Sequence, residues 1–435
     1  MVFSKEESLV YDLKLSSVGP GKTSGSDVVH ELSSMDLAMK LHYVRGVYFF
    51  SSQAVEGLTI HYIKETMFTW FNEYYYTCGR FRRSDSGRPF IKCNDCGARF
   101  IEARCDLTID EWLEMKDWSS LQKFVSQQVI GPELSFSPPV LLQITYFKCG
   151  GVAFGFSWAH VLGDAFSAID CINRWGQIMA LHQPNSPSPS TKLEEFENPH
   201  GVAKDPLSLK QVDPVGDHWI PLNGSNMETY SFKITPTQIT NLRMKVMGSF
   251  FESLCAIIWQ CIAKVRQAAN GSEPKTVTIC KRDTNKHKSG ELSNSLKIST
   301  VKAELSVLEA NPKKLANLLA EEATDETAQI EEAVEKDQGV SDFIVYGANL
   351  TFLDWQETDL YGLEFQGHKP QFVSYTIQGV GDKGAVIVLP GPNDVGNGGV
   401  GEEGRLVTLI LPEGEVLGIQ SELKKNGLLL EVELE

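Results

Sequence analysis

Positive charge is scarce in this sequence. Its 40 lysines and arginines are outnumbered by 56 aspartates and glutamates, which gives a formal net charge of −16. A nucleic-acid partner would require a surface rich in Lys and Arg to neutralise phosphates, so the composition argues against one. The same charge balance disfavours direct adsorption of the protein to anionic lipid.

Long uninterrupted hydrophobic runs are also missing. The first residues, "MVFSKEESLVYDLKLSS", show no basic region followed by an apolar one, so no secretory signal is expected. The longest stretch of low charge runs from Pro138 to Gly163 and is interrupted by Gln143, Lys148 and a glycine pair. It predicts two buried strands around a turn rather than a membrane-spanning helix. Without a signal, the nine cysteines are expected to be reduced thiols in the cytosol or nucleus.

The 435 residues, with 42% hydrophobic and 22% charged side chains, suffice for two or three globular domains. Apolar patterning predicts strands at "PPVLLQITYF" and "GGVAFGFSWA", and a helix at "DAFSAIDCINRWGQIMALH". Residues 183–216 are rich in Pro, Ser and charge, which indicates a long crossover. Residues 1–182 and 217–435 are therefore predicted to be two α/β domains with mixed sheets.

Two short motifs have competing interpretations. Cys93 and Cys96 in "CNDC" have zinc-ligand spacing, but the other nearby cysteines are not paired as a structural zinc site requires. The turn of a hairpin spanning "RPFIKCNDCGARFIEA" accounts for this stretch, so we expect no metal here. "GVGDKG" at 379–384 matches the dinucleotide-binding spacing, yet no helix follows it, and we interpret it as a hairpin turn.

The stretch "FGFSWAHVLGDAFSA" places His160 four residues before Asp164, where a predicted strand ends and a helix begins. In one interpretation, His160 faces a cleft and takes a proton from an alcohol or amine, because its unperturbed pKa lies near neutrality. In the other, His160 is a buried structural residue and Asp164 stabilises the exposed N–H groups of the helix start. The pattern alone leaves both interpretations open.

"SWAHVLGDAFSA" and "TCGRFRRSDSGRPFIKCNDCGARFIEA" resemble segments of the BAHD acyltransferases of plants, which move acyl groups from coenzyme A to alcohols or amines. The resemblance covers nearly the whole chain. It implies two chloramphenicol-acetyltransferase-like domains with mixed sheets flanked by helices, joined by a long crossover loop, with a channel between them. It also implies that His160 is the candidate general base and that Asp164 is structural, paired with Arg282.

The second signature of that family, DFGWG before Lys-Pro, is altered here to "EFQGHKP". Glu364 stands in place of Asp and Phe365 is retained, but Gln366, Gly367 and His368 replace Gly, Trp and Gly. Loss of the Trp removes a large packing anchor, and loss of the two glycines changes the accessible backbone angles.

"MDLAMKLHYVRGVYFF" and "SDFIVYGANLTFLD" closely resemble the ECERIFERUM/Glossy branch of the family, whose members are associated with cuticular wax. This resemblance implies an accessory protein that supports very-long-chain fatty acid elongation by a ketoacyl-CoA synthase of the endoplasmic reticulum, and not an autonomous acyltransferase. The protein would require no cofactor, with acyl-CoA as a candidate ligand or substrate. It would be cytosolic, without a membrane span of its own, and would reach the endoplasmic reticulum through its partner; the nucleus is a second candidate location.

Two alternatives stay open beside the accessory role. The first is an acyl-CoA-dependent O- or N-acyltransferase with His160 as the general base. The second is a metal-binding module around Cys93 and Cys96. Within the accessory role, the channel could hold part of a long acyl chain, or docking alone could reshape the partner's tunnel.

Overall fold

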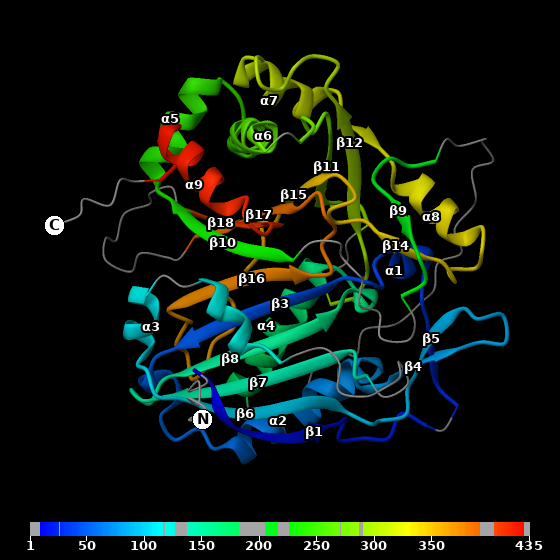
Figure 1. Cartoon of the computed structure of the whole chain (residues 1–435). Helices are drawn as coiled ribbons and strands as arrows, with labels where there is room; N and C mark the ends of the chain where they lie inside the picture. Colours follow the sequence, from blue (N-terminus) through cyan, green and yellow to red (C-terminus); the bar gives the residue numbers. More distant parts are fainter. Residues whose placement is uncertain are drawn as a thin grey trace, which may run out of the picture.

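The structure is a computed structural model that describes residues 9–25, 27–115, 118–126, 137–181, 205–215, 226–269, 271–286, 290–391 and 404–429. Two large sheets lie one above the other, with most helices on the outside (Figure 1). The first sheet has the order β1-β6-β7-β8-β3-β16 and the second has the order β10-β18-β17-β15-β11-β12-β13. Both sheets mix parallel and antiparallel pairs, as the sequence predicts.

The strands of the first sheet are β1 (Tyr11–Val18), β6 (Ala98–Cys105), β7 (Val140–Phe147), β8 (Val152–Ala159), β3 (Tyr43–Phe50) and β16 (Phe372–Gln378). Every residue of β3 and β8 is buried, because elements cover both faces of the sheet at its centre. The helices of this half are α1 (Ser34–Ala38), α2 (Ile60–Glu73), α3 (Ile109–Met115) and α4 (Ala165–Leu181). Its short 3-10 helices are η1 (Ser52–Val55), η2 (Tyr75–Cys78), η3 (Trp118–Phe124) and η5 (His160–Leu162). Strands β7 and β8 and helix α4 are those that the hydrophobic pattern predicts.

Helices α2 and α4 pack together against the first sheet. The rings of Trp70 and Trp175 stack with centroids 5.8 Å apart, and the Trp70 indole nitrogen donates to the carbonyl of Cys171 at 2.9 Å. Both indoles are buried, so they contribute large apolar areas to the core while the Trp70 N–H keeps a hydrogen-bond partner.

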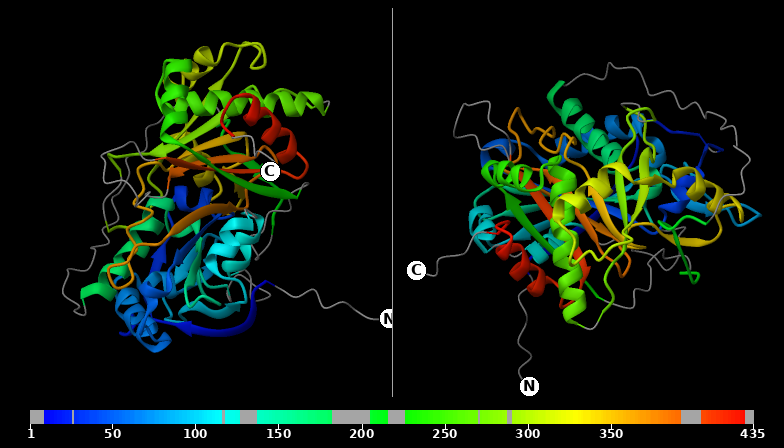
Figure 2. Two further views of the ribbon diagram at one scale, coloured as in Figure 1. Left: turned by 90° about the vertical axis from the view of Figure 1, so that its left-hand side faces the viewer. Right: turned by 90° about the horizontal axis from the view of Figure 1, so that it is seen from above.

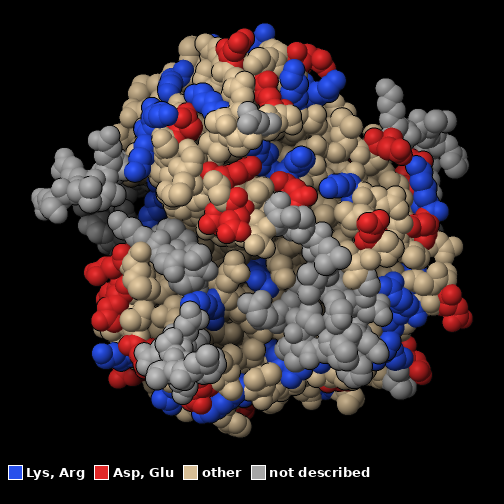
Figure 3. All heavy atoms as spheres, viewed as in Figure 1, with Lys and Arg blue, Asp and Glu red and all other residues tan. Residues whose placement is uncertain are grey.

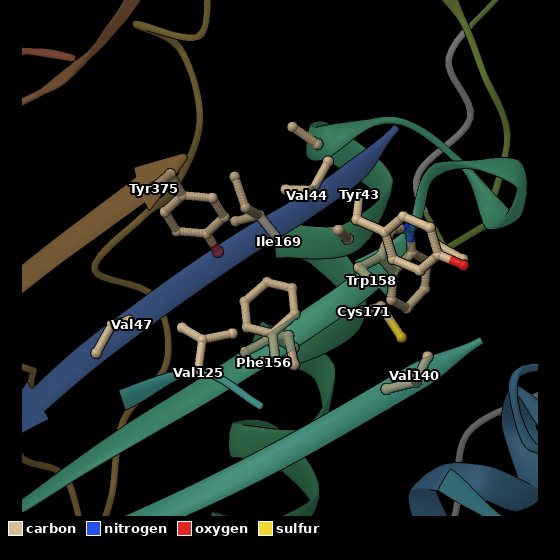
Figure 4. Close-up of a cluster of buried hydrophobic side chains, with 14 of the residues drawn as sticks. Tyr43, Val44, Val47, Val125, Val140, Phe156, Trp158, Ile169, Cys171 and Tyr375 are labelled. Atoms are coloured by element: carbon tan, nitrogen blue, oxygen red, sulfur yellow. The ribbon is translucent and has the colours of Figure 1, made fainter. Parts of the chain in front are cut away.

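The centre of the first sheet depends on a glycine in β3. Phe156 on β8 and Tyr375 on β16 pair opposite Gly46 on the two neighbouring strands. Figure 4 shows both rings beside β3. A Cβ atom at Gly46 would lie 2.5 Å from Phe156 and 2.8 Å from Tyr375. Glycine is required here because the two aromatic rings occupy the space of a side chain.

The strands of the second sheet are β10 (Met227–Ile234), β18 (Arg405–Pro412), β17 (Ala385–Pro390), β15 (Leu350–Asp354), β11 (Thr276–Arg282), β12 (Leu296–Lys302) and β13 (Thr324–Asp325). Its helices are α5 (Pro236–Val246), α6 (Phe250–Ala268), α7 (Pro312–Glu321) and α9 (Val416–Lys425), and α6 lies on the side facing away from the first sheet (Figure 2). Strand β17 shows why this sheet is buried on both faces. Ile387 and Leu389 join the core shared with the first sheet, whereas Val386 and Val388 join the core beneath the helices.

No single helix in the described ranges is long and apolar enough to cross a membrane. Helices α5 and α6 pass that test only as a pair, by length and composition, and they are bent by 80° at the break between them. Most of α6 is buried in the core of the second half.

Strand β16 belongs to the second half by sequence but to the first sheet by pairing. It lies antiparallel to β3, with Tyr375 opposite Gly46, whereas the next strand, β17, lies in the second sheet. The segment 379–384 therefore connects two sheets, and the prediction of a hairpin turn there is wrong. Gly379 is needed because a Cβ atom would lie 2.1 Å from the Leu41 carbonyl oxygen. Strand β16 follows the predicted domain boundary at residue 217 in the sequence but lies in the first sheet. This boundary therefore does not coincide with the division between the two sheets.

The predicted hairpin around Cys93 and Cys96 is also wrong. Strand β5 (Pro89–Lys92) pairs with β4 (Arg80–Arg83) and β2 (Val29–Glu31) in a small sheet, whereas β6 pairs with β1 and β7. The alternation of apolar residues located both strands but could not identify their partners, because β5 pairs with the preceding strand β4 and β6 pairs with strands that lie far away in the sequence.

The remaining elements connect the two halves at one side. Of the predicted crossover 183–216, the described part 205–215 contains β9 (Lys210–Val212), which pairs with β14 (Asp342–Ile344). The acidic region between 311 and 337 forms two helices, α7 and α8 (Thr327–Glu335), with the short strand β13 between them.

Candidate functional site

His160 lies where the predicted strand ends. Strand β8 ends at Ala159, η5 begins at His160, and Asp164 directly precedes α4. Between them Gly163 has a φ of 144° and lies against the loop at Ser293, where a Cβ atom would come within 2.9 Å of the Ser293 amide nitrogen. The glycine therefore lets the chain turn from strand to helix in close contact with the second half.

The His160 imidazole is closed off by a tyrosine from the second half. His160 Nε2 lies 3.0 Å from the hydroxyl oxygen of Tyr346, a hydrogen bond between residues 186 positions apart. Both side chains have no exposed surface. The Nε2 atom is thus already hydrogen-bonded inside the protein.

A second histidine holds that tyrosine in place. His42 Nε2 accepts hydrogen bonds from the backbone N–H groups of Val345 and Tyr346, both at 3.2 Å. The ring of His42 packs against that of Tyr346 with centroids 4.7 Å apart. Burial, and secondarily the nearby His160, lower the pKa of His42 to about 3. The imidazole is therefore neutral at physiological pH, as an acceptor of two N–H groups must be.

Burial also lowers the pKa of His160, while the charge of Asp164 and a hydrogen bond with Asn294 partly oppose this shift. Asn294 donates to the His160 carbonyl oxygen at 2.8 Å and to Asp36 Oδ1 at 2.7 Å. His160 is accordingly a neutral imidazole, the protonation state of a general base, held by residues of both halves.

Asp164 has a structural position. Its Oδ1 accepts from the Ser167 amide at 3.0 Å, which caps the start of α4. Its Oδ2 accepts from the amide and hydroxyl of Ser295, at 2.9 and 3.2 Å. No ion pair between Asp164 and Arg282 is present among the described residues; the Arg282 guanidinium lies 5.0 Å from the centre of the Phe166 ring. Serine donors thus satisfy the carboxylate for which the resemblance implied an arginine.

The altered second signature forms a tight turn. Phe365 and His368 exchange two backbone hydrogen bonds of 3.0 and 2.9 Å, with Gln366 and Gly367 both at positive φ between them. Glycine at 367 suits this turn because it adopts a positive φ without strain.

Phe365 is the packing anchor of that turn. Its buried ring stacks on Phe50 with centroids 4.1 Å apart and meets the edge of Trp175 at 5.5 Å. The two signatures lie near opposite ends of β3, about 23 Å apart by the rise of seven strand residues, since Phe50 ends this strand and Tyr43 pairs with Ala159 beside His160. The turn therefore does not contribute to the surroundings of His160.

The cysteines of "CNDC" differ in environment. The side chain of Cys93 is buried in the core of the first half, whereas Cys96 is exposed. The part of the chain that the structure describes contains no group of three His, Cys, Asp or Glu side chains that could hold a metal ion.

Four residues around His160 and Asp164 were not identified from the sequence: His42, Asn294, Ser295 and Tyr346. His42 and Tyr346 lie in the two blocks, "KLHYVRG" and "FIVYGAN", that carry the resemblance to the wax-associated branch. Those blocks were the available signal, but nothing in a linear pattern indicates that they meet.

The chain is similar in sequence to known proteins over nearly its whole length. The sequence model of the Transferase family matches residues 15–425. The protein ECERIFERUM 26-like of Arabidopsis thaliana is 42% identical over 421 residues, which cover 97% of this chain and 96% of that protein.

Two solved structures show the same fold. The structure of vinorine synthase matches this one with a TM-score of 0.73 at 17% sequence identity. The match covers 97% of this chain and 98% of the vinorine synthase chain. The structure of TRI101 of F. sporotrichioides, complexed with coenzyme A and T-2, matches with a TM-score of 0.67 at 12% sequence identity. The match covers 92% of this chain and 99% of the TRI101 chain. The predicted architecture of two sheet-rich halves flanked by helices is confirmed by these likenesses.

Proposed function

The chain belongs to the BAHD transferase family, and within that family we propose that it is an accessory protein of very-long-chain fatty acid elongation rather than an independent acyltransferase. It acts with a ketoacyl-CoA synthase of the endoplasmic reticulum, from the cytosolic side, and lengthens the product for cuticular wax. The similarity to an ECERIFERUM protein over almost the whole chain supports this choice within the family.

The observation that carries the proposal is the hydrogen bond between His160 Nε2 and the Tyr346 hydroxyl. A general base must place its free nitrogen within hydrogen-bond reach of the substrate proton. Here His160 Nε2 is bonded to a buried phenol, and His42 fixes the backbone that carries the phenol. His160 is therefore part of the contact between the two halves, which is a scaffold role.

The two large sheets share one hydrophobic core. Apolar side chains from the inner face of the second sheet, such as Ile387 and Leu389, belong to the same buried cluster as the first sheet. A body of this kind resists deformation, because close-packed interiors transmit rather than absorb strain. Docking of such a body onto the synthase, with reshaping of the synthase's own tunnel, is the mechanism we favour over a chain-binding channel.

Co-expression with candidate ketoacyl-CoA synthases, in a host that lacks them, tests the proposal. The parent protein is expected to lengthen the fatty acids made by one synthase and to change nothing when expressed alone. Purified protein with acyl-CoA and varied alcohols or amines is expected to release no coenzyme A thiol above background. Acyl transfer in that assay, together with no effect on elongation, would overturn the proposal.

Acyl-CoA-dependent transfer is the second candidate, favoured by the neutral His160 and by the likeness to a structure complexed with coenzyme A. In that case His160 takes the acceptor's proton, the acceptor oxygen or nitrogen bonds to the thioester carbon, and the thiolate leaves. Tyr346 would first have to move away from Nε2. Tyr346→Phe, which frees this nitrogen, should then raise or preserve transfer, whereas an accessory protein gives none with either residue.

A further inference from the structure

An exposed corner of the second half carries basic and apolar side chains together. We call it the basic corner and define it by six residues: Arg243, Met244, Lys245, Met247, Lys313 and Lys314. The first four lie at the end of α5 and just after it, and the two lysines lie in the first turn of α7. Lys313 Nζ lies 3.6 Å from Met247 Sδ, so the two segments form one surface.

Helices α5 and α6 meet at 80° at this corner. Met247 ends α5 in the left-handed conformation, with a φ of 58°, and turns the chain into α6. Met244 is 65% exposed and Met247 is 71% exposed. The opposite side of α5 is anchored, since Ile239, Leu242 and Val246 are buried in the core beneath it.

Charge at the corner is opposite to that of the whole protein. Residues 235–251 and 310–320 contain four basic residues and no Asp or Glu, although acidic residues outnumber basic ones by 56 to 40 in the chain. Lys245, Lys313 and Lys314 form no ion pair with any described residue. Figure 3 shows Lys and Arg side chains gathered at the upper left of the molecule, over α5 of Figure 1.

Local charge decides what this corner can bind. At physiological ionic strength electrostatic interactions are screened over about 8 Å. The net charge of −16 therefore does not prevent a basic corner from meeting an anionic surface, provided the rest of the protein stays farther away. Lysines beside exposed apolar side chains are typical of segments that lie in the interface of a membrane.

We propose that the basic corner binds the surface of an anionic phospholipid membrane, with Met244 and Met247 entering the headgroup region and the lysines and arginine meeting lipid phosphates. The assignment of this corner to the endoplasmic-reticulum membrane rests on the proposed function, because a partner of a synthase in that membrane works beside its cytosolic leaflet. The contact is weak and reversible, as four basic residues and two methionines allow. It would orient the protein before docking.

Co-sedimentation of the full-length protein with lipid vesicles tests this inference. Vesicles of phosphatidylcholine alone are compared with vesicles of phosphatidylcholine and phosphatidylinositol at about four to one, an anionic surface like that of a cytoplasmic leaflet. The parent should bind only the anionic vesicles, and added salt should release it. Because no synthase is present, failure here leaves the elongation proposal standing, and failure of elongation leaves this result standing.

Matched double variants make the test specific. Each lysine at an anionic surface contributes about fivefold in affinity, so Lys313→Gln with Lys314→Gln should weaken binding about 25-fold. Lys297→Gln with Lys302→Gln removes two exposed lysines from β12 instead and should bind like the parent. Absence of binding to anionic vesicles, equal binding to both kinds, or unchanged binding by the corner variant would overturn the inference.

Discussion

The ammonium group of Lys40 lies 2.9 Å from Asp342 Oδ1, with the lysine side chain wholly buried. This ion pair joins the segment after α1 to strand β14 in the other half of the sequence. Lys40 Nζ also lies within hydrogen-bond distance of the carbonyls of Gly339, Val340 and Ser341, at 3.2, 3.0 and 2.6 Å. Burial lowers the pKa of Lys40, and the charge and hydrogen bond of Asp342 oppose that shift.

Lys40→Met should therefore destabilise the protein strongly. The substitution leaves a buried carboxylate and several carbonyls without their donor, which typically costs about 3 to 5 kcal/mol. Chemical denaturation of the purified variant measures the loss. Lys302→Met, at an exposed pair with Glu304, is the control and should change stability by less than about 0.5 kcal/mol. Equal stability of the two variants would contradict the role given to Lys40.

Asp164 and Arg282 should respond differently to substitution. Asp164→Ala removes the cap of α4 and leaves the Ser295 amide unsatisfied, which together cost about 2 to 4 kcal/mol. Arg282→Gln removes only a contact with the Phe166 ring, worth about 0.5 to 1 kcal/mol. Melting temperatures of the two variants measure the difference. Similar large losses in both would restore the ion pair implied by the family resemblance.

His160→Ala should still support elongation. A lost general base costs about 10²–10⁴-fold in rate, whereas a scaffold loses only a buried imidazole and its bond to Tyr346. We expect product length and yield close to the parent in the co-expression experiment, with protein abundance checked by immunoblot. A folded, abundant variant that no longer lengthens the product would support catalysis by His160.

Stability should fall with decreasing pH through the buried histidines. The pKa of His42 is about 3 in the folded protein, against about 6.5 for an unperturbed histidine. Between these values the unfolded chain binds a proton that the native protein does not, so acid favours unfolding. One such histidine contributes a slope of up to about 1.4 kcal/mol per pH unit.

The free energy of unfolding is measured between pH 7 and pH 4. Most of this interval lies between the pKa of an unperturbed histidine, about 6.5, and that of His42 in the folded protein, about 3. The pKa of His160 is lowered too, so His160→Ala should show a shallower dependence than the parent. Parallel curves for the parent and His160→Ala would show that His160 titrates normally in the folded protein.

Local patterns in the sequence determined a large part of the fold. The alternation and length of the apolar runs located β7, β8 and α4, and with them the place of His160 at a strand end, because these signals need only neighbouring residues. The blocks around His42 and Tyr346 likewise indicate the family and its wax-associated branch from local sequence alone.

Only the tertiary structure decided which elements meet. Strand β16 pairs with β3 across the two halves, and Tyr346 reaches His160 from 186 residues away. Ser295, rather than Arg282, satisfies the Asp164 carboxylate. A linear pattern predicts which residues are buried. The hydrogen-bond partner of a buried polar group depends instead on how distant segments pack together. The closed state of the His160 imidazole, on which the accessory role rests, is a contact of that kind.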